Sequence, residues 1–506
     1  MSAEGSTAAS IPAGAVRRSL AWLTIANIIA KSSQFVIGIL VARILSPHDF
    51  GIFAVALVVF SVVINISELG VGTAVIREHD DIKEVAPTAV TLSIISSGAL
   101  AILMYGTAPA IATSLGSPET AKAIEILSLV VLLAGPNAVP SALLTRDFLQ
   151  GRRFFIDIAN FAVANTLLII LALSGWGVLA FAWSRVAGQV ATVIMLHVLS
   201  RHRYWPGFNL QQARKLLFFG LPLVSSSLVG YTISSVSTIV LGKLSGATSL
   251  GSYTLANNIT NWPLGLFSGL IDSLGLPVFS RIHKDKMSLS IYLNNASRVT
   301  SAAFFYITTM CVALANPLVS ALYGPKWEGA GLILAFFAIF GSVRVLIALY
   351  TVVLIACNAP KRLFWIQVTW LAALTPAVFL SVNVAGAVGA AIANVGVSLI
   401  VILPLTLWNV QRGTGISAIS IFTPTVPPLL AAVAAGLVAA AVSSSSTDPL
   451  GALIGGGCAG TALYVGILAN WGRRLLRESG RLFVSGSKAD KKEFEDRKYD
   501  STSSAP

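Results

Sequence analysis

Apolar residues fill long runs along the chain, and short stretches rich in polar residues separate one run from the next. Most runs are long enough for a helix to cross the ~30 Å hydrocarbon core of a bilayer. The strict alternation of apolar and polar residues that marks strands of a membrane barrel does not occur. The pattern therefore predicts an all-α polytopic membrane protein with about 14 transmembrane helices, numbered here as spans 1 to 14, over residues 19–45, 52–75, 86–108, 121–145, 155–174, 176–199, 214–241, 251–278, 290–316, 328–356, 362–384, 386–410, 420–444 and 450–471.

One polar stretch between two apolar runs occurs twice. The first copy covers residues 42–54 and the second covers residues 241–254. Each copy contains Leu-Ser, a turn, a glycine and an aromatic residue two positions later, and Gly251 follows Gly51 by 200 residues. A recurrence at this distance indicates two halves rather than an array of short repeats.

Other segments of the two halves also correspond. Leu115-Gly116 before span 4 matches Tyr323-Gly324 before span 10, and Arg152-Arg153 before span 5 matches Lys361-Arg362 before span 11. Six spans per half is an even number, so the halves point the same way across the membrane. We therefore expect two parallel six-helix lobes around a central cavity plus two extra C-terminal helices. In span 14, Gly451-x-x-x-Gly455 and Gly456-x-x-x-Gly460 indicate close helix packing. The expected divisions are 1–200 (spans 1–6), 201–215 (an interfacial cytoplasmic linker), 216–412 (spans 7–12), 413–472 (spans 13 and 14) and 473–506 (a basic, disordered cytoplasmic tail).

Composition and charge agree with a membrane location. Only 11% of the residues are charged, whereas soluble proteins carry about 25%. The net charge of +13 could indicate a nucleic-acid partner, but the basic residues are spread between the apolar runs rather than gathered in one patch. Seventeen Lys and Arg residues fall in alternate inter-span segments and four fall in the others. This excess predicts that both termini face the cytoplasm.

The sequence resembles the polysaccharide-flippase branch of the multidrug/oligosaccharidyl-lipid/polysaccharide exporter superfamily. The resemblance covers nearly the whole chain, and its clearest marks are Ala42-Arg43-Ile44-Leu45-Ser46-Pro47-His48-Asp49-Phe50-Gly51, Leu69-Gly70-Val71-Gly72-Thr73-Ala74 and Leu322-Tyr323-Gly324-Pro325-Lys326-Trp327. It implies a bacterial inner-membrane protein that flips undecaprenyl-pyrophosphate-linked oligosaccharide repeat units to the outer leaflet. It further implies membrane lipids, a polysaccharide polymerase and export machinery as partners, and no cofactor.

Four basic residues lie inside predicted spans, where a charge is costly. Lys31, Arg185 and Arg344 are close to mid-span, and Arg298 is nearer the inner surface. A central charge costs roughly 2.5–3.5 kcal/mol on insertion scales, so the four together cost on the order of 10 kcal/mol. Acidic residues in the spans lie towards span ends. We therefore predict a wet, anion-receiving cavity; the alternative is that these cations pair with carbonyl groups or reach the interface.

Polar residues in spans 1, 7 and 8 extend this hypothesis, because the resemblance implies that these spans face the cavity. Gln34, Ser226, Asn257, Asn258 and Asn261 could bond sugar hydroxyl groups, although interhelical hydrogen bonds would explain them equally well. Glu68 and Asp272 occupy nearly equivalent places in the two halves. They are predicted to form an inner gate, with Arg298 as one candidate partner. No grouping of His, Cys or acidic residues has the spacing of a metal site or a catalytic triad.

Two other functions stay open. A drug or cation exporter of the related branch would need carboxylates deep in its cavity. A membrane polysaccharide polymerase would need a large outer loop to carry catalytic residues, and the predicted outer loops are short.

Overall fold

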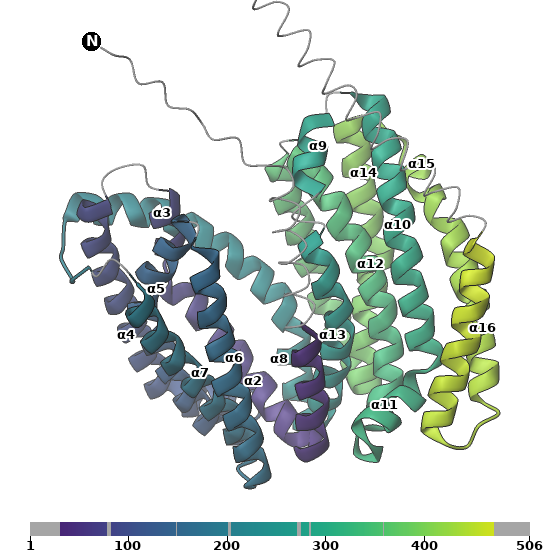
Figure 1. The fold of residues 1–506 in the computed structure, drawn as a ribbon, viewed down its shortest axis with the longest axis horizontal. Coiled ribbons are helices and arrows are strands. Elements are labelled where there is room, and N and C mark those ends of the chain that lie inside the picture. Colours follow the sequence, from purple (N-terminus) through teal and green to yellow (C-terminus); the bar gives the residue numbers. More distant parts are fainter. Residues whose placement is uncertain are drawn as a thin grey trace, which may run out of the picture. The chain divides into compact units, whose positions relative to one another are not determined.

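The computed structural model of the chain describes residues 31–77, 82–147, 149–200, 204–270, 275–282, 285–357 and 359–469. All regular elements in these ranges are helical (Figure 1), as expected where lipid cannot satisfy backbone polar groups. Residues 31–44 form the first described helix. It is followed by α2 (Pro47–Ser67), α3 (Val71–Arg77), α4 (Ile82–Ser114), α5 (Ala121–Arg146), α6 (Gln150–Leu173), α7 (Val178–Leu199) and α8 (Leu210–Leu270).

The remaining helices continue in chain order. They are α9 (Leu276–Ile282), α10 (Lys286–Ala313), α11 (Ala315–Tyr323), α12 (Ala330–Ala356), α13 (Pro360–Gly396), the π-helix η4 (Val397–Ile402), α14 (Leu403–Thr414), α15 (Ala418–Phe422), α16 (Val426–Ser443) and a last helix over Pro449–Ala469. Short 3₁₀ turns η1 (Pro118–Thr120), η3 (Pro325–Trp327) and η5 (Thr423–Thr425) precede α5, α12 and α16. The prediction of an all-α polytopic membrane protein is confirmed.

Ten helices in the described part of the chain are long and apolar enough to cross a membrane, or eleven if α10 and α11 count as one bent span. Two of the ten contain a sharp break at a turn that the sequence predicts. Gly246 has φ 77° and ψ 172° inside α8, and Ala385-Gly386 interrupt α13. Each break falls where the sequence predicts a turn between two spans, so each of these long helices corresponds to a predicted pair.

Two bends were not predicted. Span 2 is broken between α2 and α3, where Leu69 and Gly70 have φ values of 46° and 64°. Such values favour glycine and are uncommon for leucine. The turn lies against α8, because a Cβ on Gly70 would come within 2.7 Å of the Cα of Gly220. The second bend is the 76° angle between α10 and α11, where Pro317 in the first turn of α11 has no N–H to continue the preceding helix.

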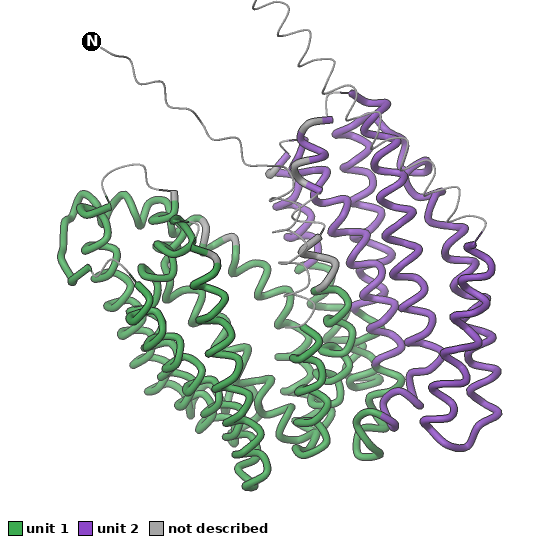
Figure 2. Tube along the Cα trace, viewed as in Figure 1, with its two compact units in different colours: residues 1–270, 322–333, 371–393 green, residues 271–321, 334–370, 394–506 purple. Residues whose placement is uncertain are grey.

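The chain divides into two compact units (Figure 2). Unit 1 comprises residues 1–270, 322–333 and 371–393, and unit 2 comprises residues 271–321, 334–370 and 394–506. The expected division at residues 201–215 was drawn from the internal repeat and stays a prediction. In unit 1, α2, α4, α5 and α7 pack around small side chains such as Ala108, Ala112 and Ala123, which are fully buried. Small residues let membrane helices approach closely.

Corresponding local geometry appears in both halves of the sequence. Arg152 donates to the carbonyl of Leu199 at 2.8 Å within unit 1, and Arg362 donates to the carbonyl of Asn409 at 3.3 Å within unit 2. Both bonds span 47 residues. Likewise, Gly177 has φ 54° and ψ −130°, and Gly386 has φ 53° and ψ −131°. The two halves are therefore built alike at these positions.

The last two helices pack on α10 within unit 2. Tyr306 and Tyr464 stack with ring centroids 4.7 Å apart, and the Tyr464 hydroxyl donates to the carbonyl of Ala302 at 2.6 Å. A Cβ on Gly456 would come within 2.7 Å of the carbonyl oxygen of Ala439, and one on Gly460 within 3.0 Å of the carbonyl oxygen of Ala435. The close packing predicted for Gly456-x-x-x-Gly460 is confirmed.

Candidate functional site

A cavity of about 630 Å³ lies within unit 1. The helix over residues 31–44 and helices α2, α6, α7 and α8 supply most of its wall. Its polar lining residues are Lys31, Gln34, Asn160, Asn165, Ser184, Arg185, Gln189, Thr254, Asn258 and Asn261. These polar groups sit among aromatic and aliphatic side chains, and the volume falls in the range of about 300–1,000 Å³ typical of small-molecule sites.

Two helical stripes form one side of the cavity. Lys31, Gln34, Phe35 and Gly38 on the first described helix have the spacing i, i+3, i+4, i+7, and so do Asn258, Asn261, Trp262 and Gly265 on α8. Residues at this spacing share one face of a helix. The indole Nε1 of Trp262 donates to the carbonyl of Lys31 at 2.8 Å, and the rings of Phe35 and Trp262 stack with centroids 4.8 Å apart. These contacts hold the two stripes together.

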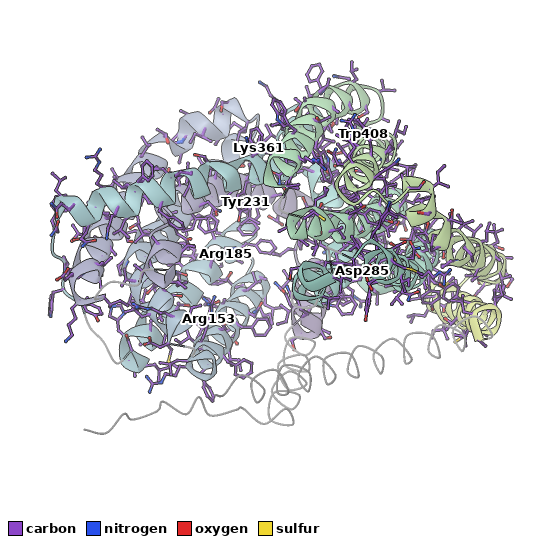
Figure 3. The ribbon with its side chains drawn as sticks, turned by 90° about the horizontal axis from the view of Figure 1, so that it is seen from above. Arg153, Arg185, Tyr231, Asp285, Lys361 and Trp408 are labelled. Atoms are coloured by element: carbon purple, nitrogen blue, oxygen red, sulfur yellow. The ribbon has the colours of Figure 1, made fainter. Side chains whose placement is uncertain are left out.

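The two cations of the cavity come from different helices. Lys31 has an exposed side chain, and its ammonium lies 3.7 Å from the point that a Cβ of Gly265 would occupy. The Arg185 guanidinium lies 5.7 Å from the ring centre of Phe53 and 5.9 Å from that of Phe60. In Figure 3, Arg185 lies among the helices of unit 1. The described lining residues include no aspartate or glutamate, so the cavity carries a net positive charge.

The amide groups of the lining differ in how they are held. Asn160 donates to Thr192 Oγ1 at 2.8 Å, and Asn165 donates to the carbonyl of Phe161 at 2.7 Å. Asn261 donates to the Oδ1 of Asn257 at 3.0 Å, so half-buried Asn257 orients Asn261. Asn258 is exposed to the cavity. Asparagine side chains carry both a donor and an acceptor, the chemistry that a polar ligand needs.

The repeated sequence stretch closes one end of this cavity. A Cβ on Gly51 would overlap the carbonyl of Ala247, and a Cβ on Gly251 would overlap the carbonyl of Pro47. The two contacts exchange equivalent residues, which is the pattern that a twofold axis produces. We call the set Pro47, Gly51, Ala247 and Gly251 the glycine contact. The neighbouring Phe50 lines the cavity, so the cavity ends here.

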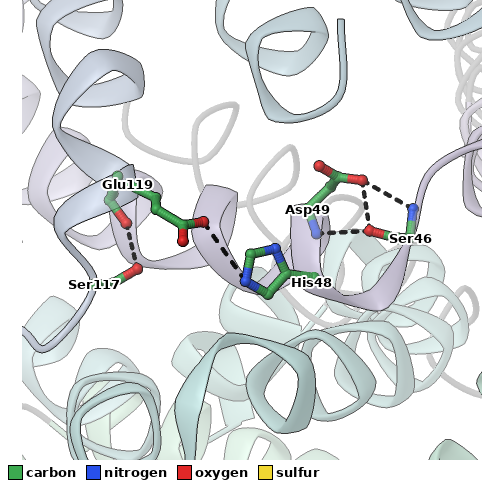
Figure 4. Close-up of polar contacts among 6 residues, drawn as sticks. Ser46, His48, Asp49, Ser117 and Glu119 are labelled. Carbon is green, nitrogen blue, oxygen red and sulfur yellow. Dashed lines mark hydrogen bonds and ion pairs between the residues drawn. The ribbon is translucent and has the colours of Figure 1, made fainter. Parts of the chain in front are cut away.

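Local bonds fix the start of α2 beside the glycine contact. Ser46 and Asp49 form a capping box, in which the Asp49 amide donates to Ser46 Oγ at 3.2 Å and the Ser46 amide donates to Asp49 Oδ2 at 3.1 Å (Figure 4). His48 lies 3.6 Å from the carboxylate of Glu119, with 48% and 68% of the two side chains exposed. An exposed contact of this kind contributes little to stability, whereas a helix cap contributes about 1 kcal/mol.

Residues 322–327 clamp the end of the first described helix within unit 1. Lys326 donates to the carbonyls of Arg43 and Leu45, both at 2.8 Å, and the fully buried Trp327 donates to the carbonyl of Ala42 at 2.8 Å. Burial lowers the pKa of Lys326, and the nearby Asp49 carboxylate partly offsets this effect. The matching Gly116 lies against Lys243, where a Cβ would come within 3.3 Å of the Lys243 Cα. The correspondence predicted between these segments therefore extends to their contacts.

The other predicted site residues lie elsewhere. Arg298, on α10, is half-buried, and Arg344, on α12, is exposed and lies 6.0 Å from the ring centre of Phe340; both belong to unit 2. Glu68 is the C-cap residue of α2, and its side chain is exposed. Asp272 and the side chain of Ser226 lie outside the described part of the structure. The inner gate and the roles of these residues therefore stay predictions.

Sequence reasoning missed most lining residues, among them Phe35, Asn160, Asn165, Gln189 and Trp262. A signal for the amides was present, because Asn160 and Asn165 stand in a span that is mostly apolar. The aromatic pair gave no such signal, since aromatic residues are ordinary in membrane helices. Among the described residues, no group of three His, Cys, Asp or Glu side chains could hold a metal ion.

Comparison with known proteins agrees with this architecture. Residues 40–331 match the family profile described as polysaccharide biosynthesis protein. The chain is 24% identical over 481 residues to the succinoglycan biosynthesis transport protein ExoT of Rhizobium meliloti (strain 1021), covering 92% of this chain and 95% of that protein. It is 23% identical over 329 residues to the lipopolysaccharide biosynthesis protein WzxC of Escherichia coli (strain K12), covering 64% and 66% of the two chains.

Solved structures show the same fold. The lipid II flippase MurJ in an inward closed conformation superposes with a TM-score of 0.71 at 15% identity, covering 89% of this chain and 99% of that one. An inward-facing multidrug resistance MATE transporter of the MOP superfamily gives a TM-score of 0.59 at 16% identity, covering 76% and 94%. Transport proteins and not enzymes recur among these relatives, and the resemblance noted in the sequence is confirmed. The chain is a multi-pass membrane protein with the fold of these MurJ and MATE structures, and it belongs to the polysaccharide biosynthesis protein family.

Proposed function

We propose that this chain flips an undecaprenyl-pyrophosphate-linked oligosaccharide repeat unit across the bacterial inner membrane for surface polysaccharide synthesis. The observation that carries the proposal is the cavity lining: Lys31 and Arg185 face it, and the described lining residues include no carboxylate. A cation inside a membrane domain is costly unless water or an anion reaches it. A diphosphate is such an anion, and both lysine and arginine bind phosphate groups well.

The heights of the two cations suit a diphosphate. Arg185 is eight residues along α7 from Gly177, which lies beside Asp49 at the glycine contact. Lys31 is twelve residues before Arg43, which lies at the same end. At 1.5 Å per residue, the two cations differ in depth by roughly 6 Å. Asn261 and Asn258 lie about one and two helical turns along α8 from Gly265, the residue beside the Lys31 ammonium. Their amides can bond hydroxyl groups of the attached sugars, while the lipid tail stays in the bilayer.

The glycine contact supports alternating access. Opening the cavity towards the outer face requires Gly51 to leave Ala247 and Gly251 to leave Pro47, and the reciprocal pairing lets both separate in one movement of two lobes. The excess of basic residues predicts that both termini face the cytoplasm and that the glycine contact lies at the outer face. A repeat unit released there would pass to the polymerase and export machinery.

The alternatives fit the cavity less well. A drug or cation exporter would need an acidic group in the cavity, and the described lining has none. A polymerase would need a catalytic constellation, whereas the polar lining consists of amides, hydroxyls and two cations. The sidedness of the lipid-linked repeat unit in a deletion strain separates these functions.

In that experiment, everted and right-side-out membrane vesicles from the deletion strain are treated with an enzyme that cleaves the repeat unit. Flipping predicts repeat units that are cleaved only in everted vesicles, and complementation restores cleavage in right-side-out vesicles. Repeat units that already face outwards in the deletion strain would contradict the proposal and would favour a polymerase.

A further inference from the structure

The aromatic pair Phe35 and Trp262 has no part in binding phosphate, yet it occupies the centre of the two stripes that carry Lys31 and Asn258. Both rings line the cavity and keep part of their surface exposed to it. Trp262 is also held in orientation, because its Nε1 donates to the carbonyl of Lys31. A rigid, partly exposed aromatic pair in a polar cavity is a recognisable binding surface, since aromatic rings supply large contact area at small entropic cost.

Sugar rings have both apolar and polar groups that suit such a surface. One face of a pyranose carries several C–H groups, which pack on an aromatic ring, while the hydroxyl groups around its edge bond amides. Here the aromatic pair is flanked by Gln34, Asn258 and Asn261, with amide groups one helical turn or less away. The arrangement therefore combines an apolar platform with hydrogen-bonding groups at its rim, as small-molecule sites typically do.

The position of the aromatic pair relative to Lys31 indicates which sugar of the substrate would lie on it. The ammonium of Lys31 lies over Gly265, one turn along α8 from Trp262. If Lys31 holds a phosphate, the ring bonded to that phosphate is the one within reach of Trp262. Gly38, one turn from Phe35, leaves space beside the aromatic pair, because a Cβ there would meet nothing within 4 Å.

We propose that Phe35 and Trp262 form a stacking platform for the sugar ring directly attached to the diphosphate, which makes them specificity-determining residues. This inference rests on the proposed function, because it takes a glycosyl diphosphate as the substrate class. The platform adds affinity for the sugar, and the cations add affinity for the diphosphate. The two contributions can therefore be separated by comparing ligands with and without the sugar.

The test measures affinities of the purified full chain in nanodiscs for three probes: farnesol, farnesyl diphosphate, and farnesyl diphosphate carrying one hexose, either glucose or galactose. Wild type is expected to bind the diphosphate more tightly than the alcohol, and at least one hexosyl diphosphate about fivefold more tightly still, which is the size of one aromatic contact. Trp262→Leu and Phe35→Leu should lose the hexose increment and keep the diphosphate affinity. Trp262→Phe, which keeps a ring, should retain part of the increment.

Trp183→Leu is the matched control, because Trp183 is an exposed tryptophan of α7 outside the cavity lining. It should behave as wild type. Equal affinity of wild type for farnesyl diphosphate with and without either hexose would overturn the platform, as would an unchanged hexose increment in Trp262→Leu. Failure of the proposed function looks different: wild type would then bind farnesyl diphosphate no better than farnesol.

Discussion

Gly51 packs so closely on Ala247 that a single methyl group at position 51 would overlap the Ala247 carbonyl. The equivalent contact joins Gly251 to Pro47, with the partners exchanged between the two repeats. Each half supplies both a glycine and a carbonyl. The two contacts are therefore expected to form together and to separate together. It lies beside Phe50, which lines the cavity, and we propose it as an outer gate.

Gly51→Ala is expected to hold this gate apart. The added Cβ cannot fit against the Ala247 carbonyl, so α2 and the second half of α8 must separate. With Cys311, Cys357 and Cys458 replaced, a Leu57→Cys probe in the cavity should react several-fold faster with a charged thiol reagent added outside intact cells. Gly230→Ala is the matched control, since a Cβ there meets nothing within 4 Å. Equal labelling in the two variants would mean that this contact does not gate the cavity.

Trp327→Phe should destabilise the same end of unit 1. The substitution keeps an aromatic ring but removes the bond to the carbonyl of Ala42, leaving a buried acceptor unpaired at a cost of about 1–3 kcal/mol. A lowered thermal midpoint of the purified protein would show the effect. Trp176→Phe, at a 48% exposed tryptophan, is the control and should not shift the midpoint. A variant as stable as wild type would show that the clamp at residues 322–327 contributes nothing measurable.

The polar contacts at the start of α2 should differ in how much they stabilise the protein. Ser46→Ala removes the helix cap and should cost about 1 kcal/mol, whereas Glu119→Gln removes only an exposed contact to His48 and should cost less than that. Thermal unfolding of the two variants side by side gives the comparison. The reverse ranking would mean that the His48–Glu119 pair, and not the cap, fixes this end of the helix.

The helical architecture followed from the sequence because lipid leaves the backbone little choice. The repeat followed because the polar stretches around Gly51 and Gly251 resemble each other. The break at Glu68–Gly70 did not follow, since its cause is the close approach of Gly220, a residue far away in the chain. The charged lining residues Lys31 and Arg185 were found because charge inside a span is costly. Phe35 and Trp262 were not predicted, because aromatic residues are common in membrane helices. What distinguishes these two is the contact they make with each other and with Lys31.

The most direct test of an anion-receiving cavity is surface polysaccharide export by Lys31 variants in a deletion strain at matched protein levels. Lys31→Ala should abolish export while leaving membrane insertion intact, because it removes a cost of insertion as well as the charge. Lys31→Arg should retain part of the export, Lys31→Glu should export none because it repels phosphate, and Lys122→Ala, an exposed lysine outside the cavity lining, should export normally. Wild-type export by Lys31→Ala would contradict the account, because the cavity would then work without its central cation.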